Sequence, residues 1–204
     1  MNILATTYKL KRKLFENRRA NGGDRYDEVW DGVYVMSPLA DSNHQRLAGR
    51  LGTILDIVLG LTGMAEVFPG INVSDREKGW KQNYRIPDVA VLFPGGRGRI
   101  AEALCVGGPD FVVEIMSRGD RSRQKRGFYA AIGVRELLIV DRRPWGIELY
   151  RLDEGKLNLV GKSTRDEPQI LVSEVVPLRF RLIDEQGEPK IEVVHRDGEP
   201  VWVV

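Results

Sequence analysis

Two acidic residues stand at the ends of apolar segments that the sequence predicts to be short β-strands. Asp88 lies in the first segment, residues 84–92, and Glu114 closes the apolar run of the second, residues 109–117. A buried charge at a strand end is costly to desolvate unless it is paired or holds a metal. If the two strands are neighbours, the carboxylates come together, and a divalent cation is the usual remedy for their repulsion. The pattern predicts the core of a metal-dependent phosphodiesterase site, with Mg²⁺ or Mn²⁺ held by Asp88 and Glu114. The alternative is a pair of strand-end carboxylates that face solvent.

A lysine on the helix predicted over residues 120–132 supplies the cation that such a site needs. Lys125 follows Glu114 in the chain, and its ammonium can reach the carboxylates if the helix runs back over the sheet. It would then orient the attacking water or stabilise the charge that develops on the phosphate. Tyr129 lies on the same helical face, one turn later. The alternative is a solvated lysine on a basic helix face.

Glu28 and His44 are weaker candidates for the same site. Glu28 falls in a predicted hairpin strand and is a candidate outer metal ligand, or else a plain surface glutamate. His44 falls in the first turn of a predicted helix, where it can contact a phosphate or a metal-bound water, although a lone histidine is more often structural. The chain has two histidines, which rules out a multi-histidine zinc site.

A basic cluster follows Glu114 within a few residues. It can hold a nucleic-acid backbone, because phosphate contacts by Arg and Lys carry no sequence information. The alternative is a solvated helix face, and a net charge of +2 is too small to indicate a nucleic-acid binder by itself. The cluster comprises Arg118, Arg121, Arg123, Lys125 and Arg126.

The bulk composition is that of a globular protein. The chain has 204 residues, of which 42% are hydrophobic and 29% charged, so one main domain is expected. The single cysteine, Cys105, excludes an intrachain disulfide and a Cys-rich zinc site.

No apolar run is long enough to cross a membrane, and the basic N-terminus lacks the apolar core of a signal peptide, so a cytoplasmic location is expected. The glycines of residues 95–98 lack the phosphate-loop and dinucleotide patterns, so we expect no organic cofactor and a flexible loop there.

The remaining segments predict an α/β fold with helices flanking one mixed β-sheet. A helix is expected at residues 8–20, and a hairpin turns at Asp31-Gly32. A long amphipathic helix begins after Asp41 or Ser42. Further strands are expected at residues 66–73, 136–141, 147–152 and 156–160, and the segment to residue 204 reads as additional β-structure.

Taken together, these residues resemble the Uma-two family of restriction-endonuclease-like proteins, in the PD-(D/E)XK nuclease superfamily. The resemblance covers roughly residues 8–180 and implies a mixed sheet flanked by helices, a divalent metal at Asp88 and Glu114, and hydrolysis of DNA. One departure is Met116, which stands where the superfamily pattern has lysine; Lys125 looks like its migrated equivalent. The residues that carry the resemblance are Glu28, His44, Pro87-Asp88, Glu114, Ser117, Lys125, Tyr129, Gly133-Val134 and residues 138–141.

The main hypothesis is therefore a Mg²⁺-dependent nuclease domain over residues 1–184 with a β extension over residues 185–204. A homodimer is expected, because nucleases of this fold often bring two sites to two strands, and the β extension is a reasonable contact. One alternative is a non-catalytic DNA-binding module that kept the fold. Another is a structural or toxin–antitoxin partner protein that binds through its β tail.

Overall fold

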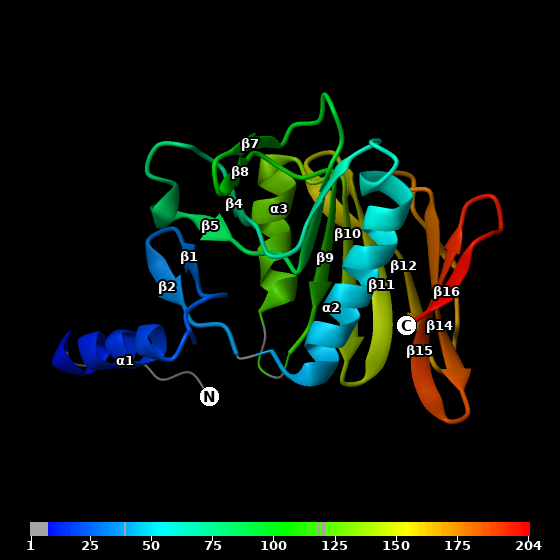
Figure 1. The fold of residues 1–204 in the computed structure, drawn as a ribbon, viewed down its shortest axis with the longest axis horizontal. Helices are drawn as coiled ribbons and strands as arrows, with labels where there is room; N and C mark the ends of the chain where they lie inside the picture. Colours follow the sequence, from blue (N-terminus) through cyan, green and yellow to red (C-terminus); the bar gives the residue numbers. More distant parts are fainter. Residues whose placement is uncertain (1–7, 39, 118, 120) are drawn as a thin grey trace.

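A six-stranded mixed sheet forms the centre of the protein (Figure 1). The structure, a computed structural model, describes residues 8–38, 40–117, 119 and 121–204, with side chains from residue 13 onward. The central strand order is β12-β11-β10-β9-β6-β3, with β9 and β10 parallel and the other neighbours antiparallel. The strands are β3 (Glu66–Phe68), β6 (Val89–Leu92), β9 (Phe111–Ile115), β10 (Glu136–Arg142), β11 (Trp145–Asp153) and β12 (Lys156–Thr164).

A second six-stranded sheet lies beside one end of the central sheet, in the order β2-β1-β5-β4-β8-β7. It is built from β1 (Glu28–Trp30), β2 (Val33–Val35), β4 (Asn72–Ser74), β5 (Tyr84–Arg85), β7 (Arg99–Ala101) and β8 (Leu104–Val106). The β1–β2 hairpin turns at Asp31-Gly32, as predicted, and both residues have a positive φ.

Residues 84–92 do not form one strand, contrary to the prediction. They divide into β5, in the second sheet, and β6, in the central sheet. Pro87 lies between them, and a proline cannot donate a ladder hydrogen bond. The break places Asp88 directly before β6, at the junction of the two sheets.

Residues 95–98, where a loop was expected, lie outside the helices and strands, but the residues that follow them form two strands that were not predicted. Residues 99–106 form the antiparallel β7–β8 hairpin, and β8 pairs in parallel with β4. Cys105 in β8 is fully buried, and burial raises the pKa of its thiol to about 11. This agrees with the expectation of a small core residue rather than a nucleophile.

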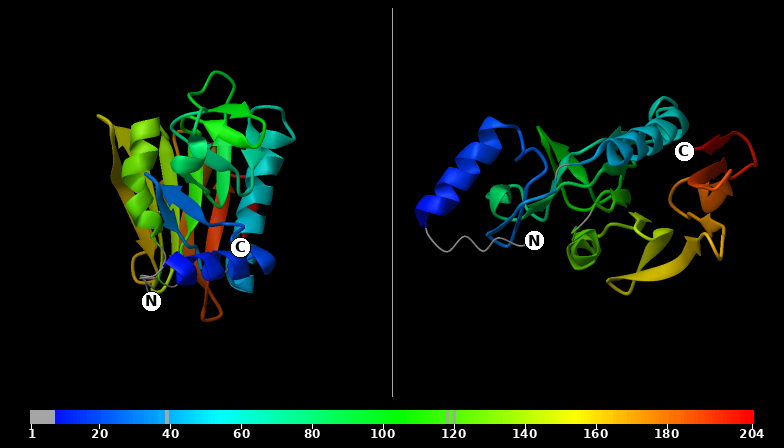
Figure 2. Two further views of the ribbon diagram at one scale, coloured as in Figure 1. Left: turned by 90° about the vertical axis from the view of Figure 1, so that its left-hand side faces the viewer. Right: turned by 90° about the horizontal axis from the view of Figure 1, so that it is seen from below.

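Helices cover both faces of the central sheet (Figure 2). Asp41 caps α2 by accepting a hydrogen bond from the backbone N–H of His44 at 2.8 Å. Because strand residues alternate between faces, Val89 and Val113 pack on the side of α2, whereas Ala90 and Val112 pack on the side of α3. The helical segments are α1 (Tyr8–Ala20), α2 (Ser42–Leu55), a π-helical turn η1 (Asp56–Gly60), the 3₁₀ turns η2 (Trp80–Gln82) and η3 (Ser122–Lys125), and α3 (Arg126–Ile132).

The helix expected over residues 120–132 is shorter than predicted. It begins as the 3₁₀ turn η3 and continues as α3, while Asp120 lies outside the described residues. Gly133, at φ 88°, ends it in the left-handed conformation, as the sequence indicates. None of the described helices is both long and apolar enough to cross a membrane.

The C-terminal strands form a four-stranded antiparallel sheet, which packs against the core on the α2 side. Phe180 in this sheet stacks on Phe111 of β9 with ring centroids 6.1 Å apart. The expected domain boundary after residue 184 falls inside β14, before its last residue, and β14 pairs with β15 along its whole length. The strands are β13 (Leu171–Val172), β14 (Leu178–Glu185), β15 (Glu188–His195) and β16 (Val201–Val203).

Candidate active site

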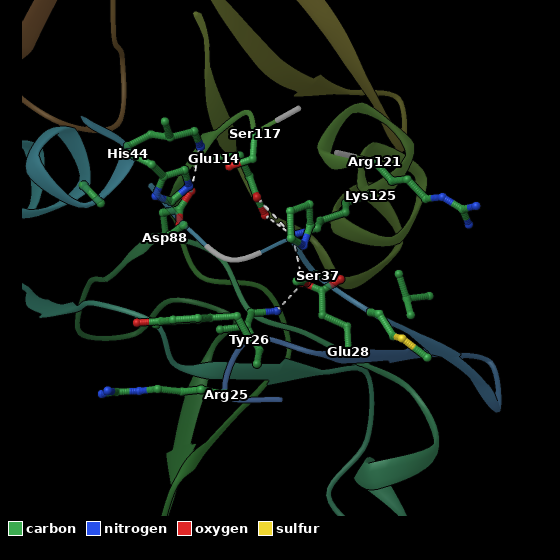
Figure 3. A pocket seen from close by; sticks show the side chains of 18 of the residues that line it. Arg25, Tyr26, Glu28, Ser37, His44, Asp88, Glu114, Ser117, Arg121 and Lys125 are labelled. Carbon is green, nitrogen blue, oxygen red and sulfur yellow. Dashed lines mark hydrogen bonds and ion pairs between the residues drawn. The ribbon is translucent and has the colours of Figure 1, made fainter. Parts of the chain in front are cut away.

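A cavity of about 1120 Å³ opens between the second sheet, α1, α2 and the ends of β6 and β9 (Figure 3). The side chains that line it come from distant parts of the chain and from both six-stranded sheets. All five predicted catalytic residues line it: Glu28, His44, Asp88, Glu114 and Lys125.

Asp88 and Glu114 meet because β6 and β9 are antiparallel neighbours. Val89 pairs with Val113, so Asp88, one residue earlier, stands opposite Glu114. The Asp88 carboxylate also accepts a hydrogen bond from the backbone N–H of Ile115 at 2.6 Å. The structure therefore brings together the two carboxylates that the strand pattern singled out.

The Glu114 carboxylate is 2% exposed and is held by three side chains of the following helical segment. Lys125 Nζ lies 2.9 Å and 3.0 Å from its two oxygens. The Tyr129 hydroxyl donates to Oε1 at 2.6 Å, and the Ser122 hydroxyl donates to Oε2 at 3.1 Å. The prediction that Lys125 reaches the acidic residues is confirmed, and Tyr129 shares its face.

Glu28 reaches the same lysine from the second sheet. Its Oε1 lies 2.8 Å from Lys125 Nζ and accepts a hydrogen bond from the backbone N–H of Ile86 at 2.8 Å. Its Oε2 accepts from Trp30 Nε1 at 2.6 Å. Lys125 thus bridges Glu28 and Glu114, and so ties the second sheet to the central one.

Negative charge is in excess at this site. Burial raises the pKa of Glu114, the Lys125 ammonium opposes that shift, and the charges of Asp88 and Glu28 add to it. Burial and the charge of Glu114 likewise raise the pKa of the Tyr129 hydroxyl, which keeps it a hydrogen-bond donor. A cationic ligand would relieve the repulsion among the three carboxylates.

His44 stands on the far side of Asp88, in the first turn of α2. Its Nε2 lies 3.3 Å from Asp88 Oδ2. Burial alone would lower the pKa of this imidazole, but the hydrogen bond and charge of Asp88 outweigh it and raise the pKa. His44 is thereby positioned as a donor to the carboxylate next to the cavity.

The donor set fits a hard divalent cation. Among the described residues, no group of three or more His, Cys, Asp or Glu side chains has the arrangement of a complete metal cage. Mg²⁺ does not require one, because it is usually held by one or two carboxylates, with waters and substrate phosphate completing its shell. Asp88, whose side chain is 18% exposed, and the adjacent Glu114 supply two oxygen donors at the cavity.

The predicted basic cluster divides into side chains at the cavity and side chains away from it. Arg121 lines the cavity with Lys125. Arg123 instead pairs with Asp141 at 2.9 Å and with Glu148 at 3.0 Å, and Arg126 lies over the ring of Tyr150 at 4.8 Å. Arg118 lies outside the described residues.

Two residues that hold the site were not predicted from the sequence. Trp30 lies two positions after Glu28 in the same strand, so strand alternation alone could have placed both side chains on one face. No comparable signal marks Ser122, because a lone serine in a basic segment has no distinguishing spacing. Its role depends on how η3 folds back over β9.

Comparison with known proteins gives a family and a fold. The sequence profile of the Uma2 family, described as "Putative restriction endonuclease", matches residues 13–184. A crystal structure of a putative nuclease belonging to DUF820, from Anabaena variabilis, is similar with a TM-score of 0.57 and 18% sequence identity. The similarity covers 72% of this chain and 80% of that one. The search of curated proteins finds no match.

Proposed function

Since the chain belongs to the Uma2 family, whose description is "Putative restriction endonuclease", we propose that it hydrolyses DNA phosphodiester bonds with the help of Mg²⁺ or Mn²⁺. The observation that carries this proposal is the Lys125 bridge. One buried lysine lies within 3.0 Å of two buried glutamates, beside a third carboxylate, in a cavity that opens to solvent. A chain has little structural reason to gather this much like charge next to a cavity.

Asp88 and Glu114 would hold the metal, because they are the paired oxygen donors at the strand ends. When bound, the cation polarises the phosphate and lowers the pKa of a coordinated water. Glu28 would assist as an outer ligand or, through its 2.8 Å contact, as the group that orients Lys125.

Three further side chains would have separate roles in the reaction. Lys125 Nζ would donate to the attacking water or to a phosphate oxygen and so stabilise the negative charge that develops there. Tyr129 would keep Glu114 in place through its 2.6 Å hydrogen bond. His44, through Nε2, would hold the Asp88 carboxylate and, when protonated, place a positive charge at the rim of the cavity.

The partner assignments belong to the same proposal. DNA is the substrate, and Arg121 is the member of the basic cluster best placed to contact its backbone, since it lines the cavity. Arg118, Arg123 and Arg126 stay predictions as DNA contacts. A homodimer, a cytoplasmic location and the absence of an organic cofactor also stay predictions.

One observation favours a second candidate, a DNA-binding module without catalysis. Both oxygens of Glu28 and of Glu114 already have hydrogen-bond or ion-pair partners within the protein. Together with Met116 at the position of the superfamily lysine, this complete set of partners is what a structural polar network without a metal would have.

Cleavage assays with matched variants separate the two candidates. Plasmid DNA is incubated with the wild type, Glu114→Gln and Lys125→Met in Mg²⁺, in Mn²⁺ and in a chelator. Glu148→Gln is the control, because Glu148 is a buried glutamate of the central sheet that does not line the cavity. We expect metal-dependent cleavage by the wild type and the control and none by the other two variants. Wild-type DNA binding without cleavage in either metal would support the binding module instead.

A further inference from the structure

The cavity has a wall that the proposed chemistry does not use. It is formed by the β1–β2 hairpin and the residues on either side of it. Three of its large apolar side chains are exposed to solvent: Tyr26 at 41%, Val33 at 64% and Met36 at 38%. Single exposed apolar side chains are common on protein surfaces, whereas exposed apolar side chains that cluster at one site indicate a binding surface.

Tyr26 differs from the other aromatic side chains of this wall because its hydroxyl makes no hydrogen bond to the described residues and its ring is exposed. Trp30 donates to Glu28 and carries the guanidinium of Arg85 on its ring at 4.6 Å. Tyr34 donates to Asp27 at 2.6 Å and packs edge-on against Phe15. The Tyr26 hydroxyl has no hydrogen-bond partner among the described residues, and no other described aromatic side chain is as exposed.

Positive charge lies next to this ring. The guanidinium of Arg25 stands 5.7 Å from the Tyr26 ring centroid, and Figure 3 shows the two side chains running side by side below Asp88. Within the described residues, neither Arg25 nor Arg121, which also lines the cavity, has a carboxylate within ion-pair distance. Arg18 is different, because Asp27 neutralises it. The cavity lining therefore combines an exposed aromatic ring on this wall with two arginines that have no carboxylate partner, Arg25 beside the ring and Arg121 from the segment before η3.

We infer that Tyr26 stacks an unpaired base, so that the substrate is single-stranded DNA or a single-stranded stretch of a longer molecule. This inference rests on the proposed function, since it places the base beside the acidic site. Proteins that bind single strands combine a basic surface with aromatic rings, on which bases stack whatever their identity. In a duplex the bases are paired and stacked on each other, so their faces are not available to Tyr26. An apolar hairpin wall adds nothing to the binding of a hydrated phosphate backbone.

The test measures binding apart from cleavage. A fluorescent oligonucleotide of about 16 nucleotides is titrated with the protein as a single strand and as a duplex, by anisotropy in a chelator and again in Ca²⁺. Tyr26→Ala removes the ring, and Tyr26→Phe keeps it while removing the hydroxyl. Leu159→Ala is the control, because Leu159 is 54% exposed on β12 and does not line the cavity. Thermal unfolding of every variant establishes that it is folded.

We expect the wild type to bind the single strand more tightly than the duplex. Tyr26→Ala should weaken single-strand binding about fivefold or more, whereas Tyr26→Phe and Leu159→Ala should bind as the wild type does. A wild type that prefers the duplex, or a Tyr26→Ala variant with unchanged single-strand affinity, would overturn the inference.

Cleavage of the same oligonucleotides in Mg²⁺ separates this result from the proposed function. Tyr26-dependent binding of the single strand without any cleavage means that the proposed catalysis fails while the base-stacking site stands. Metal-dependent cleavage of single strand and duplex at equal rates, unaffected by Tyr26→Ala, means that the proposed catalysis stands and the base-stacking site fails.

Discussion

Two buried glutamates on neighbouring strands have opposite surroundings. Glu114 lies near the end of β9 and Glu136 at the start of β10, and they are 2% and 0% exposed. The two strands are parallel, with Glu136 level with Phe111 and Glu114 level with Ile139. The two carboxylates thus stand at opposite ends of one strand pair and, by strand alternation, on opposite faces.

Glu136 is satisfied by groups that have a structural role. Its Oε1 accepts from Arg151 Nε at 2.8 Å and from the backbone N–H of Glu174 at 3.1 Å, and its Oε2 accepts from the Ser173 hydroxyl. These contacts attach the connection between β13 and β14, in the C-terminal sheet, to β10 and β11 of the central sheet. Glu136 does not line the cavity.

Burial alone does not mark a functional carboxylate. Glu136 is buried, fully bonded and distant from other uncompensated acids. Glu114 is equally buried, but it shares one lysine with Glu28, faces Asp88 and borders an open cavity. The distinguishing features are the uncompensated negative charge and access to solvent, which a metal and a substrate require.

Neutralising each glutamate in turn should separate the functional carboxylate from the structural one. Glu114→Gln should lower the rate of Mg²⁺-dependent DNA cleavage on the order of 10³-fold, because it removes a charged metal ligand. Glu136→Gln should leave the rate per folded molecule unchanged. Single-turnover cleavage, with the folded fraction measured by circular dichroism, checks both. Equal losses in the two variants would contradict the distinction.

Lys125→Met tests whether DNA cleavage requires the lysine that bridges Glu28 and Glu114 or only the carboxylates. We expect a loss of cleavage of about 10²- to 10³-fold, since a charge-stabilising donor disappears. We also expect destabilisation of about 3–5 kcal/mol, because two buried glutamates lose their cation. Added Mg²⁺ should restore part of that stability by taking the place of the ammonium. Denaturant unfolding with and without Mg²⁺ measures it, and a variant with wild-type cleavage would refute the role of Lys125.

Ser173→Ala probes the structural glutamate without touching the cavity. Removing the hydroxyl that donates to Glu136 should cost about 1–3 kcal/mol of stability, because a buried acceptor is left unsatisfied. Cleavage should not change. Glu174→Gln is the control, since that carboxylate is 69% exposed in its pair with Arg151 and should contribute under about 1 kcal/mol. Equal losses of stability in Ser173→Ala and Glu174→Gln would mean that the hydrogen bond from Ser173 to Glu136 does not hold this part of the structure together.

The pH dependence of stability should distinguish the two regions in a chelator. The pKa of Glu114 is raised by burial, so the folded protein holds its proton at pH values where the unfolded chain has lost it. Its stabilising contribution is therefore present below the ordinary pKa of a glutamate and is lost as the pH rises toward the folded value. Urea unfolding across this range should show a steeper decline for the wild type than for Glu114→Gln. Parallel curves would contradict the raised pKa.

The smallest expected effect concerns the basic cluster. Arg121→Ala should reduce the slope of log affinity against log salt for DNA by about one unit, because it removes a phosphate contact at the cavity. Arg123→Ala should change that slope less, since Asp141 and Glu148 already neutralise the guanidinium. Fluorescence titrations at several salt concentrations check this, and a larger change for Arg123→Ala would reverse the assignment.

Local pattern was enough to predict much of the fold and the centre of the site. The Asp31-Gly32 turn, the capped helix after Asp41 and the apolar strand at residues 136–141 were predicted because their signals lie within a few neighbouring residues. Asp88 and Glu114 were predicted as a pair because each stands at the end of an apolar strand. Lys125 and Tyr129 were placed on one face because four residues make about one helical turn.

Only the tertiary structure decided what surrounds that centre. The break at Pro87 places β5 in the second sheet, paired with β1, and Glu28 of β1 reaches Lys125 while Trp30 donates to Glu28. Arg121 lines the cavity whereas Arg123 pairs with Glu148, although the two arginines are near neighbours in the basic cluster. The position of the exposed Tyr26 beside the cavity also follows only from the tertiary structure. Sequence spacing determines which side chains share a strand or helix face, whereas the packing of whole sheets determines which faces meet.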